Sequence, residues 1–196
     1  MTDTKVELLF SYTVSLKMPP EVIGPVAEGI RVNFYVTGGE IRGPRCQGKL
    51  LPLGADWLLI RKDGIGMVDV RATMQMHDGA LVYTAYTGVI DPGPNGYEAF
   101  MNGTPPPKFP IRTAPRFQTA DPAYAWMNRM QAYGVGKWTW RMHGSPTTST
   151  PRCESGCKRA ALYPSACSPR LIRKVLGLTS PELGPRIRLV PGVIIA

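Results

Sequence analysis

The sequence predicts an all-β protein: a single antiparallel up-and-down β-barrel followed by an irregular C-terminal tail. Three observations lead to this prediction. Apolar and polar residues alternate with a period of two in many short segments, tight Asp-Gly turns join several of those segments, and long helical patterns are nearly absent. Closing such a meander on itself removes exposed sheet edges, which favours a barrel over the alternative, a β-sandwich.

The first part of the chain contains clear strand patterns. Residues 6–16 place a row of apolar side chains on one face, namely Val6, Leu8, Phe10, Tyr12, Val14 and Leu16. Residues 30–36 repeat this alternation, and Gly38-Gly39 is expected to turn the chain after them. Another strand is expected from about Glu40, and Gly43-Pro44 breaks it.

An antiparallel meander is expected next. Residues 56–61, 65–76 and 80–90 predict strands, and the Asp-Gly turns at 62–64 and 77–79 join them. Residues 91–110 are rich in Gly and Pro and predict a long loop, placed as a lid over one mouth of the barrel. The last strands are expected at 111–119 and 127–135, and Asp121-Pro122 opens a turn or one short helical turn between them.

The positive charge of the chain is uneven along its length. The formal net charge is +9, but residues 1–140 hold 14 Lys and Arg against 12 Asp and Glu, whereas residues 141–196 hold nine against two. The barrel is therefore nearly neutral, and no nucleic-acid partner is expected for it. No apolar run approaches the ~20 residues that span a bilayer, and the N-terminus lacks a secretory pattern. We therefore expect a soluble, cytoplasmic protein without a membrane partner, and leave open whether it forms a homodimer.

Cofactor and metal chemistry find little support in the sequence. The barrel region has no Ser/His/Asp order, no Gly-rich phosphate loop and no metal-spaced cluster of ligands, so no cofactor and no metal is expected. Cys46 is alone there, and Cys153, Cys157 and Cys167 in the tail lack the spacing of a zinc site, which indicates loose thiols. His77 falls in a tight turn and is expected to be solvated rather than catalytic.

A series of short motifs in one order runs through nearly all of residues 5–137. They are Gly38-Gly39, Gly43-Pro44-Arg45, Gly54-Ala55-Asp56-Trp57, Arg61-x-Asp63-Gly64, Asp69-x-Arg71, Asp78-Gly79-Ala80, Arg112-Thr113-Ala114-Pro115-x-Phe117, Tyr124-x-Trp126-x-Asn128 and Gly134-Val135-Gly136. Together they resemble the bacterial and fungal family known as domain of unknown function 3237. The resemblance implies an antiparallel barrel of calycin-like shape with a mostly unassigned function. It also implies fungal relatives that act as cofactor-free cyclases in polyketide pathways, by intramolecular hydroalkoxylation.

The tail departs from that family, in which a final strand follows Gly-Val-Gly and the chain then stops. Trp and Met have single codons, so the nucleotides behind residues 137–143 are partly fixed. Read from the third base of the Lys137 codon, permitted codons give Val-Asp-Met-Glu-Asp-Ala-Arg-Leu-Thr-Tyr-Tyr-Glu-Tyr-Thr-Lys-Val and a stop within Cys153-Glu154. We therefore expect a barrel domain over 1–137 and a tail over 138–196 that arises from a displaced frame or an unspliced intron. An uninterrupted transcript in the present frame would overturn this hypothesis.

The alternative is a genuine basic tail that binds RNA, DNA or an acidic surface. It draws on five cations, Arg170, Arg173, Lys174, Arg186 and Arg188, but no aromatic platform accompanies them. Residues 186–195 have the pattern of a strand that could patch an open barrel edge.

Candidate site residues lie on the predicted strands. On 65–76, Asp69 and Arg71 share one face, opposite an apolar face, and the sequence leaves open which face points inward. Asp56 could be a general acid or base near a barrel mouth, or a turn cap, with Trp57 on the opposite face. Either Tyr83 or Tyr86, which face opposite ways, could donate to a ligand carbonyl, or both could simply pack.

Three further residues complete the candidate set. Arg112 could hold an enolate or phenolate oxygen, or pair with an Asp. Trp126 and Asn128 fall on one face, where they could form an aromatic wall and an amide beside a flat ring, although core packing of Trp126 is the plainer interpretation.

These residues predict a cofactor-independent cyclase or isomerase of secondary metabolism that closes a ring on an aromatic, polyketide-like small molecule. Asp56, Arg71, Tyr83 and Arg112 form the candidate catalytic set, and Trp57, Asp69, Tyr86, Trp126 and Asn128 the candidate binding set. An Asp/Tyr pair would move one proton while an Arg stabilises the oxyanion, so Arg112→Ala would lower turnover. The alternative is a non-catalytic barrel that carries small apolar ligands.

Overall fold

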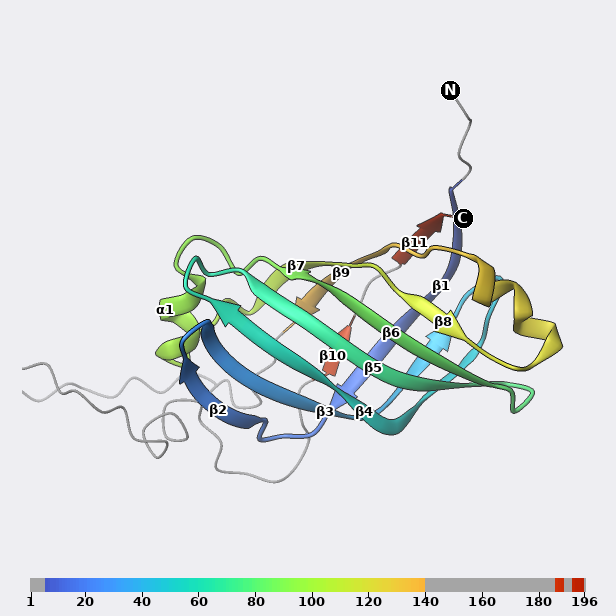
Figure 1. Ribbon diagram of the computed structural model, residues 1–196, viewed down its shortest axis with the longest axis horizontal. Helices are drawn as coiled ribbons and strands as arrows, with labels where there is room; N and C mark the ends of the chain where they lie inside the picture. The colour runs from blue at the N-terminus through green and yellow to red at the C-terminus, as the bar shows by residue number, and fades with distance from the viewer. Residues whose placement is uncertain (1–5, 140–185, 189–191, 196) are drawn as a thin grey trace, which may run out of the picture.

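The structure is a computed structural model that describes residues 6–139, 186–188 and 192–195. These residues form a curled antiparallel sheet of barrel shape with few helices (Figure 1). The elements in chain order are β1 (Val6–Leu16), β2 (Glu21–Val26), β3 (Gly29–Arg42), β4 (Gly48–Arg61), β5 (Gly66–Met76), β6 (Leu81–Ile90), α1 (Gly96–Met101), β7 (Lys108–Thr113), β8 (Arg116–Gln118), a 3-10 helix (Pro122–Arg129), β9 (Gly134–Thr139), β10 (Arg186–Arg188) and β11 (Gly192–Ile195). The predicted all-β barrel class is confirmed.

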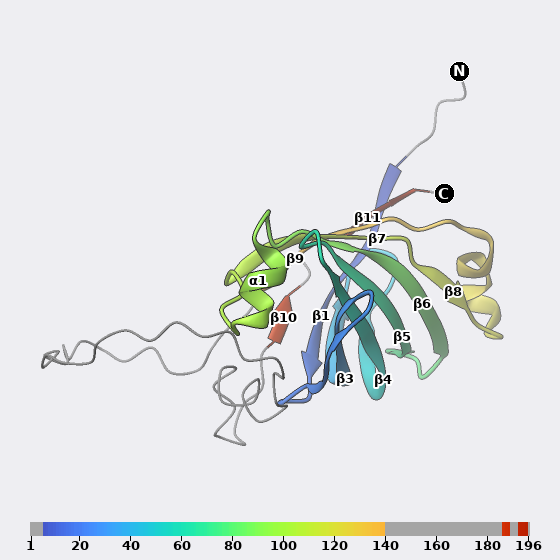
Figure 2. The same ribbon diagram turned by 60° about the vertical axis from the view of Figure 1, so that its left-hand side comes forward.

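The sheet follows the order β10-β1-β3-β4-β5-β6-β7-β9, with β2 paired to β3, β8 to β6 and β11 to β1. Figure 2 shows how strongly the sheet curls, with α1 at one end and the 3-10 helix at the other. Neighbouring strands are antiparallel throughout, as a meander requires.

The two C-terminal strands lie at the edge where the sheet would otherwise end. β10 pairs with residues 13–15 of β1, and β11 pairs with residues 6–10 of the same strand. Both also contact β9. The described parts of the expected strand, residues 186–188 and 192–195, therefore pair at the open edge. The proposed frame displacement after residue 137, the tail cysteines and the remaining tail cations lie largely outside the described residues, although β9 itself continues to Thr139.

The best-predicted strands are β1, β5 and β6, whose bounds differ from the expected ones by no more than one residue. Both Asp-Gly turns are present. The Gly64 amide donates to the Arg61 carbonyl and the Gly79 amide to the Met76 carbonyl, each at 3.0 Å. Both glycines have positive φ, +89° and +93°, which explains why glycine follows Asp there.

The prediction that Gly38-Gly39 turns the chain is wrong. β3 runs unbroken through both glycines to Arg42, and its pairing with β4 shifts register between Tyr35 and Gly39. Gly38 instead supplies a backbone φ of +143° within the strand, and Gly39 allows close packing of two strands. A Cβ on Gly39 would lie 2.0 Å from the Thr13 carbonyl oxygen of the neighbouring strand.

Replacing Gly39 with Ala is therefore expected to destabilise the protein by about 2 kcal/mol or more. The new methyl group would clash with the backbone carbonyl of Thr13, which cannot move aside as a flexible side chain could. Gly79→Ala is the matched comparison, since Gly79 has positive φ but nothing within 4 Å of its Cβ position. Its cost should be only about 1 kcal/mol of conformational strain. Urea unfolding of both variants measures the difference, and equal losses would contradict this account.

Three other segments differ from expectation. Residues 91–110 contain the short helix α1, and residues 21–26 form the unexpected strand β2. Residues 127–135 are not a strand, because the helical turn expected after Asp121 extends to Arg129. The Asp121 carboxylate caps that helix by accepting from the Ala123 amide at 2.9 Å. β9 then begins only at Gly134.

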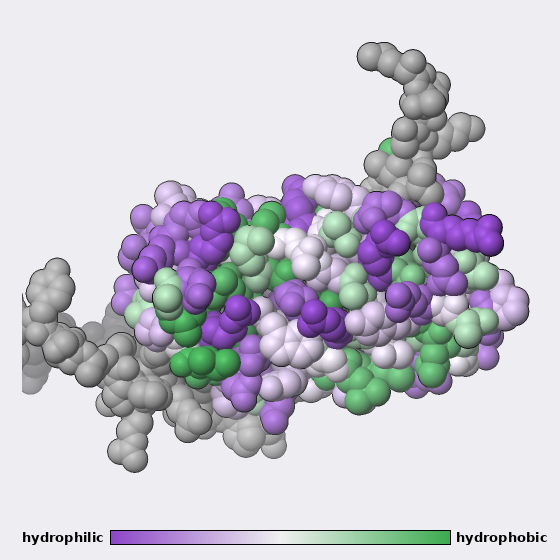
Figure 3. Space-filling model, in the orientation of Figure 1, coloured by the Kyte–Doolittle hydropathy of each residue, from purple (hydrophilic) through white to green (hydrophobic). Residues whose placement is uncertain are grey.

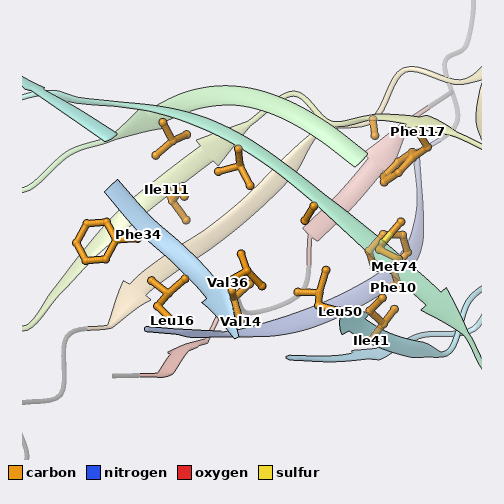
Figure 4. Close-up of a cluster of buried hydrophobic side chains, with 14 of the residues drawn as sticks. Phe10, Val14, Leu16, Phe34, Val36, Ile41, Leu50, Met74, Ile111 and Phe117 are labelled. Carbon is orange, nitrogen blue, oxygen red and sulfur yellow. The ribbon is translucent and has the colours of Figure 1, made fainter. Parts of the chain in front are cut away.

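The core fills the inside of the curled sheet (Figure 4). Alternate residues of each long strand point inward, as in the run Val68, Val70, Ala72, Met74 and Met76 of β5. At one end of the barrel, the ring of Trp138 stacks on Phe109 at 5.8 Å and meets the edge of Phe34. The outer surface mixes polar residues with small apolar patches (Figure 3).

Candidate functional site

A cavity lies inside the barrel, on the inner faces of strands from β1 to β9. Its wall is formed mainly by apolar side chains such as Phe10, Met74 and Phe117, which Figure 4 shows close together. Four wall side chains carry oxygen atoms, namely Tyr12, Asp56, Thr84 and Tyr86. The free volume is about 60 Å³. An apolar cavity of ~150 Å³ is known to bind benzene, so we expect a ring-bearing ligand to displace wall side chains as it enters.

Asp56 is the acidic group of this cavity, and β4 brings it there. The pairing of β4 with β5 shifts register between Leu50 and Gly54, and Asp56 follows as an inward-facing residue with 5% of its surface exposed. Burial among apolar atoms penalises the ionised form and raises the pKa of Asp56 from 3.8 to about 7. The nearby Asp69 charge contributes to this rise, whereas the hydrogen bond from the Asp69 amide and the charge of Arg31 oppose it.

The Asp56 carboxylate sits where the ladder between β4 and β5 is interrupted. Asp56 pairs with Val70 and Leu59 with Met67, but the described residues between them form no bridges. The Asp69 amide donates to Asp56 Oδ1 at 3.1 Å instead. The Trp57 carbonyl accepts from Arg31 Nη1 at 2.6 Å. At this gap in the sheet, the Asp56 carboxylate and the Arg31 guanidinium thus provide the hydrogen-bond partners of two backbone groups, the Asp69 amide and the Trp57 carbonyl.

Two partly buried tyrosines line the cavity together with Asp56. The Tyr12 hydroxyl donates to the Tyr86 hydroxyl at 3.0 Å, which links β1 to β6 across the barrel interior. Burial raises the pKa of both phenols well above the ordinary value, and the charge of Asp56 raises both further. Both tyrosines therefore stay protonated near neutral pH.

Among the candidates predicted from the sequence, Asp56 and Tyr86 line the cavity. Asp69 and Arg71 belong to the outer face, because the apolar face of β5 points inward. Arg71 Nη2 lies 3.4 Å from Asp69 Oδ2, and the guanidinium carbon of Arg71 lies 5.2 Å from the centroid of the Trp57 ring. These three side chains therefore form one outer cluster.

Tyr83 and Arg112 also lie outside the cavity. Tyr83 points away from it and is 38% exposed, in agreement with the prediction that it faces opposite to Tyr86. Arg112 alternates with the inward-facing Ile111 and Thr113, and its guanidinium donates to the Ile111 carbonyl at 2.9 Å. The sequence-based role of Arg112 as holder of a ligand oxyanion has no geometric support, and the expected effect of Arg112→Ala no longer follows.

Trp126 and Asn128 lie on the 3-10 helix at one end of the barrel. Arg45 stacks 4.7 Å above the Trp126 ring. The Asn128 amide accepts from the Thr119 amide at 2.8 Å and donates to the Thr119 carbonyl at 2.9 Å. Both residues are thus engaged in closing this end of the barrel.

Sequence reasoning missed Tyr12 and Thr84 as cavity residues. Tyr12 lies in the apolar row of β1, where its ring reads as core. The signal was its hydroxyl, a group that requires a partner when buried. Thr84 is two residues before Tyr86 on β6 and therefore shares its inward face.

Two further observations concern the described residues. They contain no cluster of three His, Cys, Asp or Glu side chains that could hold a metal ion. None of their helices has both the length and the apolar character needed to cross a membrane.

The fold and the site define a class, a small antiparallel β-barrel that encloses an apolar cavity with one acid and two phenols. Residues 4–144 match the profile of the family described as Protein of unknown function (DUF3237). The chain belongs to this family, in agreement with the resemblance of its motifs.

Relatives and solved structures agree with this assignment. A UPF0311 protein of Rhodopseudomonas palustris is 30% identical over 139 residues, which cover 69% of this chain and 89% of the relative. A Clostridium acetobutylicum protein of unknown function has a similar crystal structure, with a TM-score of 0.64, 28% identity, and coverage of 69% of this chain and 92% of that one. A β-barrel-like protein of Acinetobacter baumannii has a TM-score of 0.60 at 26% identity, covering 69% and 88%. An enzyme of Penicillium herquei is similar in fold, with a TM-score of 0.51 at 22% identity, covering 69% and 86%.

Proposed function

We propose that this protein is a cofactor-independent cyclase that closes an oxygen-containing ring on an aromatic, polyketide-like small molecule. The observation that carries the proposal is the Asp56 carboxyl, which is buried in an apolar cavity and has its pKa raised to about 7. A group with this pKa both accepts and returns a proton near neutral pH, which is what a general acid–base catalyst needs.

The proposed reaction is an intramolecular hydroalkoxylation, an isomerisation that needs no co-reactant. The hydroxyl oxygen of the substrate forms a bond to one carbon of a C=C bond, and the Asp56 carboxylate takes the hydroxyl proton. Asp56 then gives this proton to the other carbon of the former double bond. Substrate and product have the same atoms and electrons, so the small-molecule substrate is the only partner the reaction requires.

Two features of the wall favour ring closure on a folded substrate. The apolar surface excludes water, which strengthens the electrostatic effect of a single carboxylate and holds a flexible chain near its attacking oxygen. Met74, a flexible side chain on this wall, is suited to yield when a ring enters the small cavity. The fold shared with the Penicillium herquei enzyme is compatible with catalysis but does not identify the reaction.

The second candidate function is a non-catalytic barrel that carries small apolar ligands. The largely apolar wall favours it. A carrier has no use for a buried acid whose ionised form is costly, which is why we place it second.

Product formation separates the two functions. Purified protein is incubated with hydroxyaryl alkenes, such as ortho-allylphenol and ortho-hydroxyphenyl propenyl ketone, and the cyclic ether is measured by chromatography. We expect ring closure of at least one of the two compounds, with an excess of one enantiomer, and only the racemic background reaction with Asp56→Asn. Asp63→Asn, which removes a carboxylate from an exposed turn, is the matched control. A protein that binds these compounds and returns them unchanged would be a carrier.

A further inference from the structure

The hydrogen-bonded phenols of Tyr12 and Tyr86 form a second functional group of the cavity. Two hydroxyl groups carry two hydrogens, and the single bond between them, at 3.0 Å, uses one. No other described residue accepts a hydrogen bond from either hydroxyl. One phenolic hydrogen of the pair is therefore left to donate, inside a wall that is otherwise mainly apolar.

A donor that has no acceptor in a mainly apolar cavity wall is costly, so such a hydrogen favours a ligand that supplies the acceptor. Both phenols resist ionisation because burial raises their pKa values. The pair therefore acts only as a neutral donor near neutral pH, and it suits a carbonyl oxygen or an enolate better than a cation.

We propose that the Tyr12–Tyr86 pair binds a carbonyl oxygen, and that the substrate class is accordingly a hydroxyl-bearing α,β-unsaturated ketone rather than a simple alkene. This inference rests on the proposed cyclase function and specifies its substrate. The pair takes the oxyanion role that the sequence suggested for Arg112, whose guanidinium lies on the outer face.

With an unsaturated ketone the electron flow is complete. The substrate hydroxyl oxygen bonds to the β-carbon while Asp56 takes its proton, and the π electrons move onto the carbonyl oxygen. The free phenolic hydrogen of the pair donates to the resulting enolate oxygen, where negative charge has developed. Asp56 then returns the proton to the α-carbon and the C=O bond forms again.

The position of the pair relative to Asp56 supports this division of roles. All three side chains line one cavity, and the Asp56 charge acts on both phenols. Tyr12 and Tyr86 come from β1 and β6, whereas Asp56 comes from β4. A flat substrate can thus meet the phenols with its carbonyl and the carboxylate with its hydroxyl.

The test compares two ligands and two phenylalanine variants. Dissociation constants of ortho-hydroxyphenyl propenyl ketone and of ortho-allylphenol, which lacks the carbonyl, are measured by titration for Tyr86→Phe, for Tyr133→Phe and for the unchanged protein. Tyr133 is 47% exposed and serves as the matched control. We expect Tyr86→Phe to weaken ketone binding about fivefold to tenfold and to leave ortho-allylphenol binding within about twofold. Tyr133→Phe should change neither. Tyr12→Phe, a second variant, should also weaken ketone binding selectively, because it removes the partner that orients Tyr86.

The outcomes separate this inference from the proposed function. If Tyr86→Phe weakens both ligands equally or neither, or if the ketone does not bind the unchanged protein, the carbonyl site is wrong. Loss of ring closure in Asp56→Asn would still support a cyclase in that event. If the ketone is bound selectively through Tyr86 but is never cyclised, the carbonyl site stands and the cyclase function fails.

Discussion

Asp56→Asn is expected to raise the free energy of unfolding at pH 8, although the variant should lose its catalytic function. The pKa of Asp56 is about 7 in the folded protein and 3.8 in its ordinary state. As the pH rises from 3.8 towards 7, the unfolded chain ionises at this position while the folded chain does not, so stability falls. Well above pH 7 the folded protein carries the full penalty of a buried carboxylate, roughly 4 kcal/mol.

Asparagine removes this penalty because it is neutral and still has an oxygen to accept the Asp69 amide. Urea unfolding at pH 8 and pH 5 measures the effect, which should shrink to less than half at pH 5. Asp63→Asn should show no such gain, since Asp63 lies on an exposed turn. An Asp56→Asn variant that is less stable than the parent at pH 8 would mean that the carboxylate is a structural group.

The second prediction concerns the pH dependence of ring closure. Because the reaction begins with the Asp56 carboxylate, kcat/KM should rise about tenfold per pH unit below 7 and level off above it. The bend should lie near the Asp56 pKa of about 7. Asp56→Asn should lower the rate by roughly 10²- to 10⁴-fold and abolish the bend.

Initial rates from pH 5 to 9, with the uncatalysed rate subtracted at each pH, provide the measurement. A flat profile in the unchanged protein, or a bend that persists in Asp56→Asn, would contradict the assignment of Asp56 as the base. The two predictions together describe a trade between stability and activity. The pH range in which the carboxylate works is also the range in which it destabilises the fold.

The strands that could be predicted from the sequence are those in which apolar and polar residues alternate clearly and recognisable turns mark the ends. β5 and β6 are bounded by Asp-Gly turns and alternate cleanly, so their ends follow from the sequence. The Gly38-Gly39 pair could not be interpreted this way, because its reason is the approach of Thr13 from a neighbouring strand. Residues 127–135 contain apolar residues in a strand-like pattern, but the cap at Asp121 starts a helix that consumes part of them.

The candidate site could be predicted only in part, for a related reason. From the sequence, both Asp56 and Asp69 could be acids of a ligand pocket. The structure places Asp56 inside, after the register shift in β4, and Asp69 outside, because the apolar face of β5 points inward. Tyr12 was hidden in an apolar row, and its role depends on Tyr86, which is 74 positions away. Single-sequence patterns identify faces of strands, but they do not say which faces meet.

The gap in the ladder between β4 and β5 has a practical consequence. The amide hydrogen of Asp69 is held by the Asp56 carboxyl group and not by a backbone carbonyl. Its hydrogen bond is strong when the carboxyl is ionised and weaker when it is protonated. The nitrogen and proton resonances of this one amide therefore form a built-in spectroscopic probe of the charge on the buried acid, readable without any substrate.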